Sequence, residues 1–238
     1  FVSYRLAQQM MVFQASINSA VAYIPSINKI QNFFLLTKKK NELSQFGSIK
    51  LNLEKLKFEN IECKLEKSLI FKNLNLEIKR NSFVAITGRS GIGKSSLVDM
   101  ISGLIIPTNG KITVNGINFN TLDINYWRSN IAYVPQEHFL LKDSIKNNII
   151  LNQKFHKKKF DELLNLLELK ELNTDLDVTE KGSNLSVGQK QRISIARALY
   201  SEREIIILDE PTSSLNTLLE KKILSYLKNK IRSRTIIM

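Results

Sequence analysis

The sequence is poor in the residues from which disulfide frameworks and metal clusters are built: its 238 residues include one cysteine and two histidines. Cys63 cannot form a disulfide within the chain and has no partner at a zinc-binding spacing, so a disulfide scaffold and a zinc finger are excluded. This cysteine usage favours a reducing compartment. His138 and His156 form no ligand pair, and we expect both side chains to be exposed.

Long apolar runs are missing as well. The sequence has no run of the ~18 apolar residues that a membrane-spanning helix needs, and it has no secretory signal at its start. No internal repeat or low-complexity tract is present. The chain begins with Phe1 and stops inside the apolar run "RTIIM", so we expect it to be a fragment of a longer polypeptide.

Positive charge dominates the sequence. The formal net charge is +13, which suits a nucleic acid or an anionic membrane surface as partner. The lysines are scattered, however, so compositional bias explains the charge at least as well, and the lysine runs at 37–40 and 156–160 are typical of solvated faces. The content of 43% hydrophobic and 24% charged residues is that of a globular protein, and the length fits one full domain with an attachment.

Residues 1–44 form a region of their own. Apolar residues recur there at alternating steps of four and three, which predicts an amphipathic helix with a kink at Pro25. The stripe consists of Leu6, Met10, Phe13, Ile17, Ala20, Ile24 and Ile27. This helix either packs on its own domain or is the cytosolic end of a membrane helix whose spanning part lies upstream. The polar stretch at 37–48 predicts a linker.

Residues 45–238 form the second region, in which short β-like runs alternate with helical patterns. Strands are expected at 82–88, 111–116, 131–136 and 204–211, and helices from about Lys94 and at 160–172. Strands interleaved with helices predict an α/β fold with a mostly parallel sheet flanked by helices.

The strongest local signal is "GRSGIGKSS" at 88–96. It follows an apolar strand and precedes a helix, which is the context of a phosphate-binding loop. Glycines let backbone N–H groups close around phosphate oxygens, and the helix adds the positive end of its dipole. We expect Lys94 to reach the β- and γ-phosphates and the Ser95 hydroxyl to bind Mg²⁺. The expected phosphate contacts are Gly88, Arg89, Ser90, Gly91, Ile92, Gly93, Lys94, Ser95 and Ser96.

Two carboxylates and one amide extend this site. Asp209 and Glu210 follow a buried strand, at the strand end where ligands bind in open α/β sheets. Asp209 suits the Mg²⁺ shell, and Glu210 suits a general base that deprotonates the attacking water. Gln136 follows another strand, and its amide oxygen can contact Mg²⁺ or the same water. Together the motifs predict a nucleoside triphosphatase.

The order of these motifs, with "LSVGQKQR" at 185–192 between Gln136 and the acids, closely resembles the nucleotide-binding domain of ATP-binding cassette (ABC) transporters. The resemblance covers the chain from about residue 50 and implies a P-loop NTPase with a helical subdomain. In that family two cassettes meet head to tail, and each signature motif closes over the ATP that the other cassette holds. Ser186, Gly188 and Gln189 are therefore implied to contact ATP across a dimer.

Some positions depart from the family pattern. The aromatic residue that stacks on adenine aligns near Leu65, and an aspartate that usually follows "PTSSL" is replaced by Asn216. The family's switch histidine is expected a few residues beyond Met238.

Two other classes of ATPase share parts of this pattern. A chromosome-maintenance or repair ATPase would use the positive charge on DNA, but it needs a long coiled coil between the phosphate loop and the signature, for which the spacing leaves no room. A translation-associated cassette protein acting on ribosomes would carry no membrane-proximal helix.

The resemblance therefore implies an ATP-binding and ATP-hydrolysing subunit of an exporter or flippase, with ATP and Mg²⁺ as cofactors. The expected partners are a second cassette, identical or different, and the membrane domain of its own or a partner chain, with no nucleic acid. The expected location is the inner or plasma membrane, with the cassette on the cytoplasmic side. The transported substrate is not predicted.

Overall fold

The computed structural model describes residues 10–11, 13–14, 17, 21, 23–31, 46–65, 68–179, 182–211 and 216–238. The chain divides into two compact units, Phe1–Gln45 and Phe46–Met238. In the first unit the described residues are helical, and the helix continues through Pro25. Its exposed residues include Met10, Phe13, Ile17, Ile24 and Ile27. Leu6, Ala20 and most of the expected linker lie outside the described residues. Within the described part of the chain, each helix is too short or too polar to cross a bilayer.

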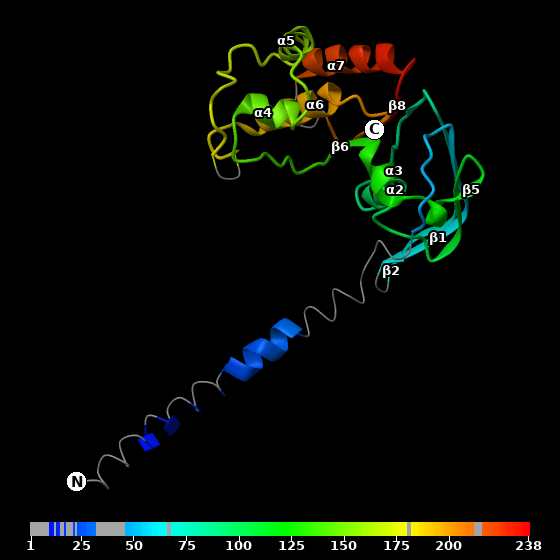
Figure 1. The fold of residues 1–238 in the computed structure, drawn as a ribbon. Coiled ribbons are helices and arrows are strands. Elements are labelled where there is room, and N and C mark those ends of the chain that lie inside the picture. The colour runs from blue at the N-terminus through cyan, green and yellow to red at the C-terminus, as the bar shows by residue number, and fades with distance from the viewer. Residues whose placement is uncertain are drawn as a thin grey trace. The chain divides into compact units, whose positions relative to one another are not determined.

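The described part of residues 46–238 contains two sheets of different kinds (Figure 1). One is antiparallel, with the order β2–β1–β4–β5, and the other is parallel, with the order β3–β8–β7–β6. The antiparallel strands are β1 (Lys55–Leu65), β2 (Ser68–Lys79), β4 (Asn109–Val114) and β5 (Ile117–Asn118). The parallel strands are β3 (Phe83–Val84), β6 (Ile131–Val134), β7 (Ile205–Leu208) and β8 (Thr235–Ile237). The α/β class is confirmed, whereas the sequence pattern did not predict the β1–β2 hairpin.

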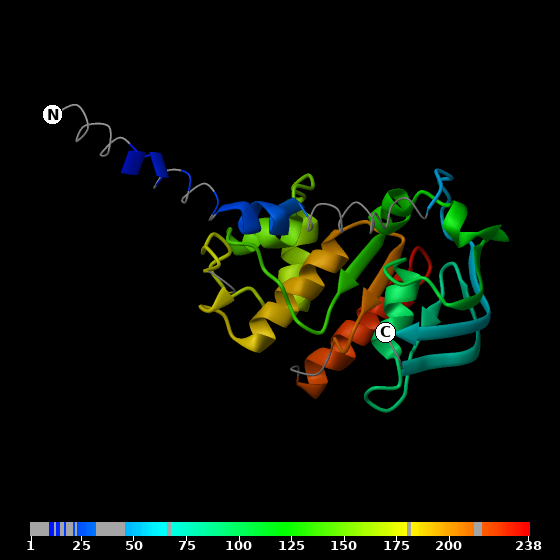
Figure 2. The ribbon, with the colours of Figure 1, turned by 90° about the horizontal axis from the view of Figure 1, so that it is seen from below.

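Helices pack around both sheets. They are α2 (Lys94–Ile101), the 3-10 turn η2 (Phe119–Thr121), α3 (Ile124–Ser129), α4 (Ile145–Ile150), α5 (Lys157–Leu166), α6 (Val187–Tyr200) and α7 (Thr217–Lys230). Figures 1 and 2 show α4, α5 and α6 together at the end of the domain opposite to β1 and β2. The expected helix at 160–172 is α5, which ends earlier because Glu168, just beyond it, has a left-handed backbone with φ of 53°.

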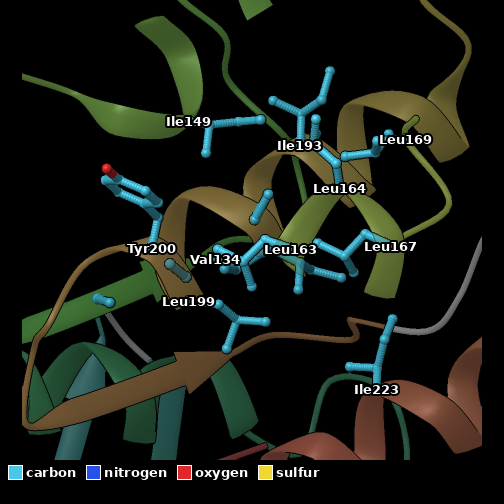
Figure 3. Close-up of a cluster of buried hydrophobic side chains, with 14 of the residues drawn as sticks. Val134, Ile149, Leu163, Leu164, Leu167, Leu169, Ile193, Leu199, Tyr200 and Ile223 are labelled. Carbon is cyan, nitrogen blue, oxygen red and sulfur yellow. The ribbon is translucent and has the colours of Figure 1, made fainter. Parts of the chain in front are cut away.

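The core has two parts because β7 is buried on both faces. Ile206 and Leu208 pack with the helices α4 to α7, whereas Ile205 and Ile207 pack with α2, α3 and the antiparallel sheet. The alternation follows from the strand geometry, in which successive side chains point to opposite faces. Figure 3 shows the first cluster, to which β6, α4, α5, α6 and α7 contribute Val134, Ile149, Leu163, Leu199 and Ile223.

Asparagine supplies several left-handed backbone positions, both in turns and within the irregular strands β1 and β2. Left-handed backbone angles occur at Asn60, Asn73, Asn81, Asn115 and Asn152. Asparagine tolerates this region better than other side chains because its short amide can bond the local backbone. At the β4–β5 turn, the Oδ1 atom of Asn115 accepts hydrogen bonds from the N–H groups of Glu54 (3.0 Å) and Lys55 (2.9 Å). The turn is therefore fixed to the start of β1.

Candidate functional site

The loop between β3 and α2 has a backbone that depends on glycine. Gly91 and Gly93 have left-handed φ angles of 79° and 103°, which L side chains rarely adopt. At Gly93 a Cβ atom would also lie 2.6 Å from the Ile70 side chain and 2.8 Å from the Phe71 ring. The loop therefore passes close to β2, and it turns directly into α2.

The start of α2 is suited to an anion. Gly93 is the N-cap of α2, and none of the side chains that the structure describes caps this end, unlike α3, α4, α6 and α7. The first N–H groups of a helix have no partner within the helix, and the dipole of the helix favours a negative charge there. Ser95 and Ser96 lie in the first turn. The Nζ atom of Lys94 donates to the carbonyl oxygens of Gly88 (3.0 Å) and Arg89 (3.2 Å), so the loop curls over the ammonium group.

The acids predicted from the sequence lie beside this loop. A cavity of ≈ 200 Å³ is lined by Lys94, Asp209 and Glu210, together with residues from the ends of β7 and β8. It lies at the carboxyl ends of the parallel strands, where α/β proteins bind their ligands. Glu210 has a left-handed φ of 49°, an uncommon angle for a side chain of its size. A strained residue of this kind often marks a functional site.

Gln136 joins the same cluster. Its Nε2 atom donates to the Oε2 atom of Glu210 at 3.0 Å. From α6, the buried Gln191 places its Nε2 atom 3.4 Å from the backbone oxygen of Glu210. The end of β7 is therefore contacted by the loop after β6 and by α6.

Asp209 adds negative charge to its surroundings at the end of β7. Burial and then the negative charge of Asp209 raise the pKa of Tyr133 to about 12. The same two causes raise the pKa of Asp99, which lies on α2. The phenolic oxygen of Tyr133 lies 3.4 Å from the Oδ2 atom of Asp209 and bonds to it. The Asp209 carboxylate is the kind of oxygen ligand that hard divalent cations prefer.

Ser186 begins α6 at a separate place. Its hydroxyl accepts from the N–H of Gln189 at 3.2 Å, and the Gln189 side chain accepts from the N–H of Ser186 at 2.8 Å, which makes a capping box. Gln189 lines another cavity, of ≈ 470 Å³, with Arg192 and Glu168. The structure thus brings Lys94, Gln136, Asp209 and Glu210 together and leaves the signature residues outside the cavity that Lys94 lines.

A protein-family model decides between the classes of ATPase considered from the sequence. Residues 71–213 match the model described as ABC transporter. The chain belongs to the ABC transporter family. An export ATP-binding/permease protein of Rickettsia typhi is 39% identical over 175 residues, which cover 71% of this chain and 30% of that protein. The lactococcin-G-processing and transport ATP-binding protein LagD of Lactococcus lactis is 35% identical over 230 residues, covering 88% of this chain and 32% of LagD.

A solved structure agrees with this assignment. The structure of a bacterial Atm1-family ABC exporter with ATP bound matches with a TM-score of 0.78 and 27% identity, covering 89% of this chain and 39% of that one. The expected P-loop NTPase fold is therefore confirmed. The chain spans about a third of the length of the curated ABC relatives described above.

The positions that depart from the ABC pattern have definite surroundings. Leu65 ends β1 and is 38% exposed. Asn216 is the N-cap of α7 and accepts from the N–H of Leu219 at 2.8 Å. His156 is exposed as expected, but the expectation for His138 is wrong, because that side chain is half-buried and its Nδ1 atom has no hydrogen-bond partner among the described residues.

Sequence reasoning missed several groups beside the site. Tyr133, Asp99 and Gln191 surround the acids at the end of β7. Tyr133 could have been found from the sequence, because it lies on the predicted strand just before Gln136. Asp99 and Gln191 could not have been found in this way. They lie on helices, and only folding of the chain brings them next to the acids.

Proposed function

We propose that this chain is the ATP-binding and ATP-hydrolysing part of an ABC exporter or flippase. The observation that carries the proposal is the cavity that Lys94 shares with Asp209 and Glu210 at the uncapped start of α2. The names of the relatives, which refer to export and transport, support the direction of transport.

ATP fits the donors at this site. The N–H groups at the start of α2 and the Lys94 ammonium suit phosphate oxygens, which carry the opposite charge. Mg²⁺ fits as well, because Asp209, the Ser95 hydroxyl and the Gln136 amide oxygen offer hard oxygen ligands in negative surroundings. A bound Mg²⁺ supplies positive charge toward the phosphate oxygens.

Glu210 is the proposed general base, which takes a proton from the attacking water. Gln136 is proposed to orient the same water or a metal ligand, since it already contacts the Glu210 carboxylate. The pair needs no histidine or thiol for this chemistry.

The proposed partner is a second cassette in a head-to-tail dimer. Ser186 and the Gly188 N–H lie at the start of α6, a second helix end that can bind phosphate. Because these residues do not line the cavity of Lys94, they fit the ATP of another cassette better than the ATP of their own. Residues 1–44 are proposed to be the end of a membrane domain, with the cassette on the cytoplasmic face of the inner or plasma membrane.

The test uses the full-length protein in lipid vesicles. Mg·ATP binding is measured with labelled nucleotide, and hydrolysis by phosphate release. Lys94→Ala is expected to weaken ATP binding about tenfold to a hundredfold, since a charged hydrogen bond contributes about 1.5–3 kcal/mol. Lys228→Ala, which removes an exposed lysine of α7, is the control and should change neither quantity. Full-length protein that neither binds nor hydrolyses ATP would refute the proposal.

A further inference from the structure

Asn148 of α4 is a fully buried polar residue whose side chain bonds almost only to one loop. Its Oδ1 atom accepts from the N–H of Leu141 at 2.8 Å. Its Nδ2 atom lies within hydrogen-bonding distance of the carbonyl oxygens of Leu141 (2.9 Å), Asp143 (3.1 Å) and Ser144 (3.1 Å). The side chain is 0% exposed, so each of these bonds is made in a setting where a lost partner is costly.

Arg197 of α6 completes this arrangement from the other side. Its Nε atom donates to the backbone oxygen of Asn148 at 2.8 Å, and its Nη2 atom donates to the Oδ1 atom of the same residue at 2.9 Å. Its Nη1 atom donates to the backbone oxygen of Phe139 at 2.8 Å. One planar guanidinium group therefore binds α4 and the loop before it at the same time. We call the pair the Asn148–Arg197 clamp.

The clamp connects the two parts of the site that the sequence singled out. Arg197 lies on the helix that Ser186 caps, and at about 1.5 Å per residue the two are about 16 Å apart on one rigid element. Phe139 follows Gln136 by a chain segment that can extend at most about 11 Å. A displacement of α6 at Arg197 is therefore passed to the backbone of Gln136 through the hydrogen bond to Phe139 and the short chain segment between Phe139 and Gln136.

Apolar packing alone does not hold this loop. Phe139 is 67% exposed and Leu141 is 44% exposed, and only Leu140 between them is buried. In contrast, the elements on either side are fixed in the core, where Val134 of β6, Ile149 of α4 and Ile193 of α6 belong to one cluster (Figure 3). The polar bonds of the clamp are thus the contacts that hold the loop backbone at Phe139 and Leu141. The end of the loop is also held from outside the clamp, because the N–H of Val178 donates to the carbonyl oxygen of Asp143 at 2.9 Å.

We propose that Asn148 and Arg197 are positioning residues that tie the loop of Gln136 to α6 and so pass movement of the signature helix to Gln136. The proposal rests on the proposed function for its catalytic consequence. Its structural part, that the clamp holds residues 137–144, stands on the contacts described above.

The first experiment measures amide hydrogen exchange of the full-length protein. Arg197→Lys keeps the charge but loses the fork of donors, and it should make the amides of residues 137–144 exchange about tenfold faster or more. Arg234→Lys is the matched control, because Arg234 is also partly buried and its Nη1 atom also donates to an α6 carbonyl, that of Leu199 at 3.4 Å. Unchanged exchange at 137–144 in Arg197→Lys would overturn the proposal.

The second experiment measures ATP hydrolysis in a double-mutant cycle. Arg197→Lys alone should lower kcat about tenfold and leave KM for ATP within about twofold, because the nucleotide contacts remain. In a Gln136→Ala background the same substitution should cost less than about twofold, since the residue through which it acts is gone. An equal loss in both backgrounds would refute the link to Gln136.

Failure of the clamp and failure of the proposed function give different results. If the wild-type protein does not hydrolyse ATP, the proposed function is refuted. The hydrogen-exchange result still decides whether the clamp holds the loop. If Arg197→Lys does not fold, Asn148→Asp replaces it, because that change keeps the side-chain shape and removes the Nδ2 donor. It should also speed exchange at 137–144, and the absence of this effect would overturn the proposal.

Discussion

The side chains of Gln136 and Glu210, which are 74 positions apart in the sequence, meet at a distance of 3.0 Å between Nε2 and Oε2. One follows β6 and the other follows β7, and these strands are parallel neighbours. Their carboxyl ends therefore reach the same edge of the sheet. The contact holds the Glu210 side chain beside the cavity that Lys94 lines.

The first prediction concerns Glu210. Glu210→Gln should bind ATP as the wild type does but hydrolyse it about a hundredfold more slowly or worse, because the phosphate contacts remain while the base is lost. Phosphate release gives the rate, and retained nucleotide on the dimer gives the binding. Glu137→Gln, which changes an exposed acid next to Gln136, is the control. Full turnover in Glu210→Gln would remove Glu210 from the role of base.

The second prediction concerns the partner cassette. Lys94→Ala and Ser186→Arg should each inactivate a homodimer. In a mixed dimer built head to tail, one composite site carries both changes and the other carries none, so partial ATPase activity should return. Co-expression with two affinity tags isolates the mixed dimer for the assay. No recovery in that dimer would mean that each site lies within one chain, contrary to the proposal.

The phosphate loop and the start of α2 at Lys94 could be predicted because their signals are local. Glycines at 88, 91 and 93 followed by a helical pattern define this turn within a few residues. The buried run at 205–208 was equally clear, since a short apolar segment before two acids fits a parallel strand. The serine cap of α6 also follows from neighbours in the chain.

The β1–β2 hairpin and the clamp could not be predicted in the same way. The pairing of β1 with β2 has register shifts, for instance between Phe58 and Ile61, which blur the alternation that marks a strand. Asn148 and Arg197 are 49 positions apart, and each reads as an ordinary polar helix residue. Their role depends on a tertiary contact, and so does the half-burial of His138.

A third prediction concerns Trp127, which is 1% exposed. Its Nε1 atom donates to the backbone oxygen of Ile101 at 2.9 Å, and its ring meets Phe119 edge to face, so it fixes α3 to the end of α2. Trp127→Ala should lower the free energy of unfolding by about 3–5 kcal/mol through the cavity that it leaves. Urea denaturation followed by circular dichroism measures this. Tyr126→Phe, which changes a side chain that bonds Asn52 at the surface, should stay within about 0.5 kcal/mol.

The last prediction concerns pH and His138. Burial lowers the pKa of His138, so the unfolded chain, in which the pKa is about 6.5, binds this proton more tightly than the folded chain. The contribution of the neutral His138 to stability is therefore fully present above about pH 6.5 and is lost as the pH falls below that value. We expect His138→Gln to lose less unfolding free energy than the wild type between about pH 7.5 and about pH 5.5. Urea titrations followed by Trp127 fluorescence at both pH values measure the difference, and His156→Gln, at an exposed position, serves as the control. If His138→Gln shows the same loss as the wild type and the control, the titration of His138 is not coupled to folding.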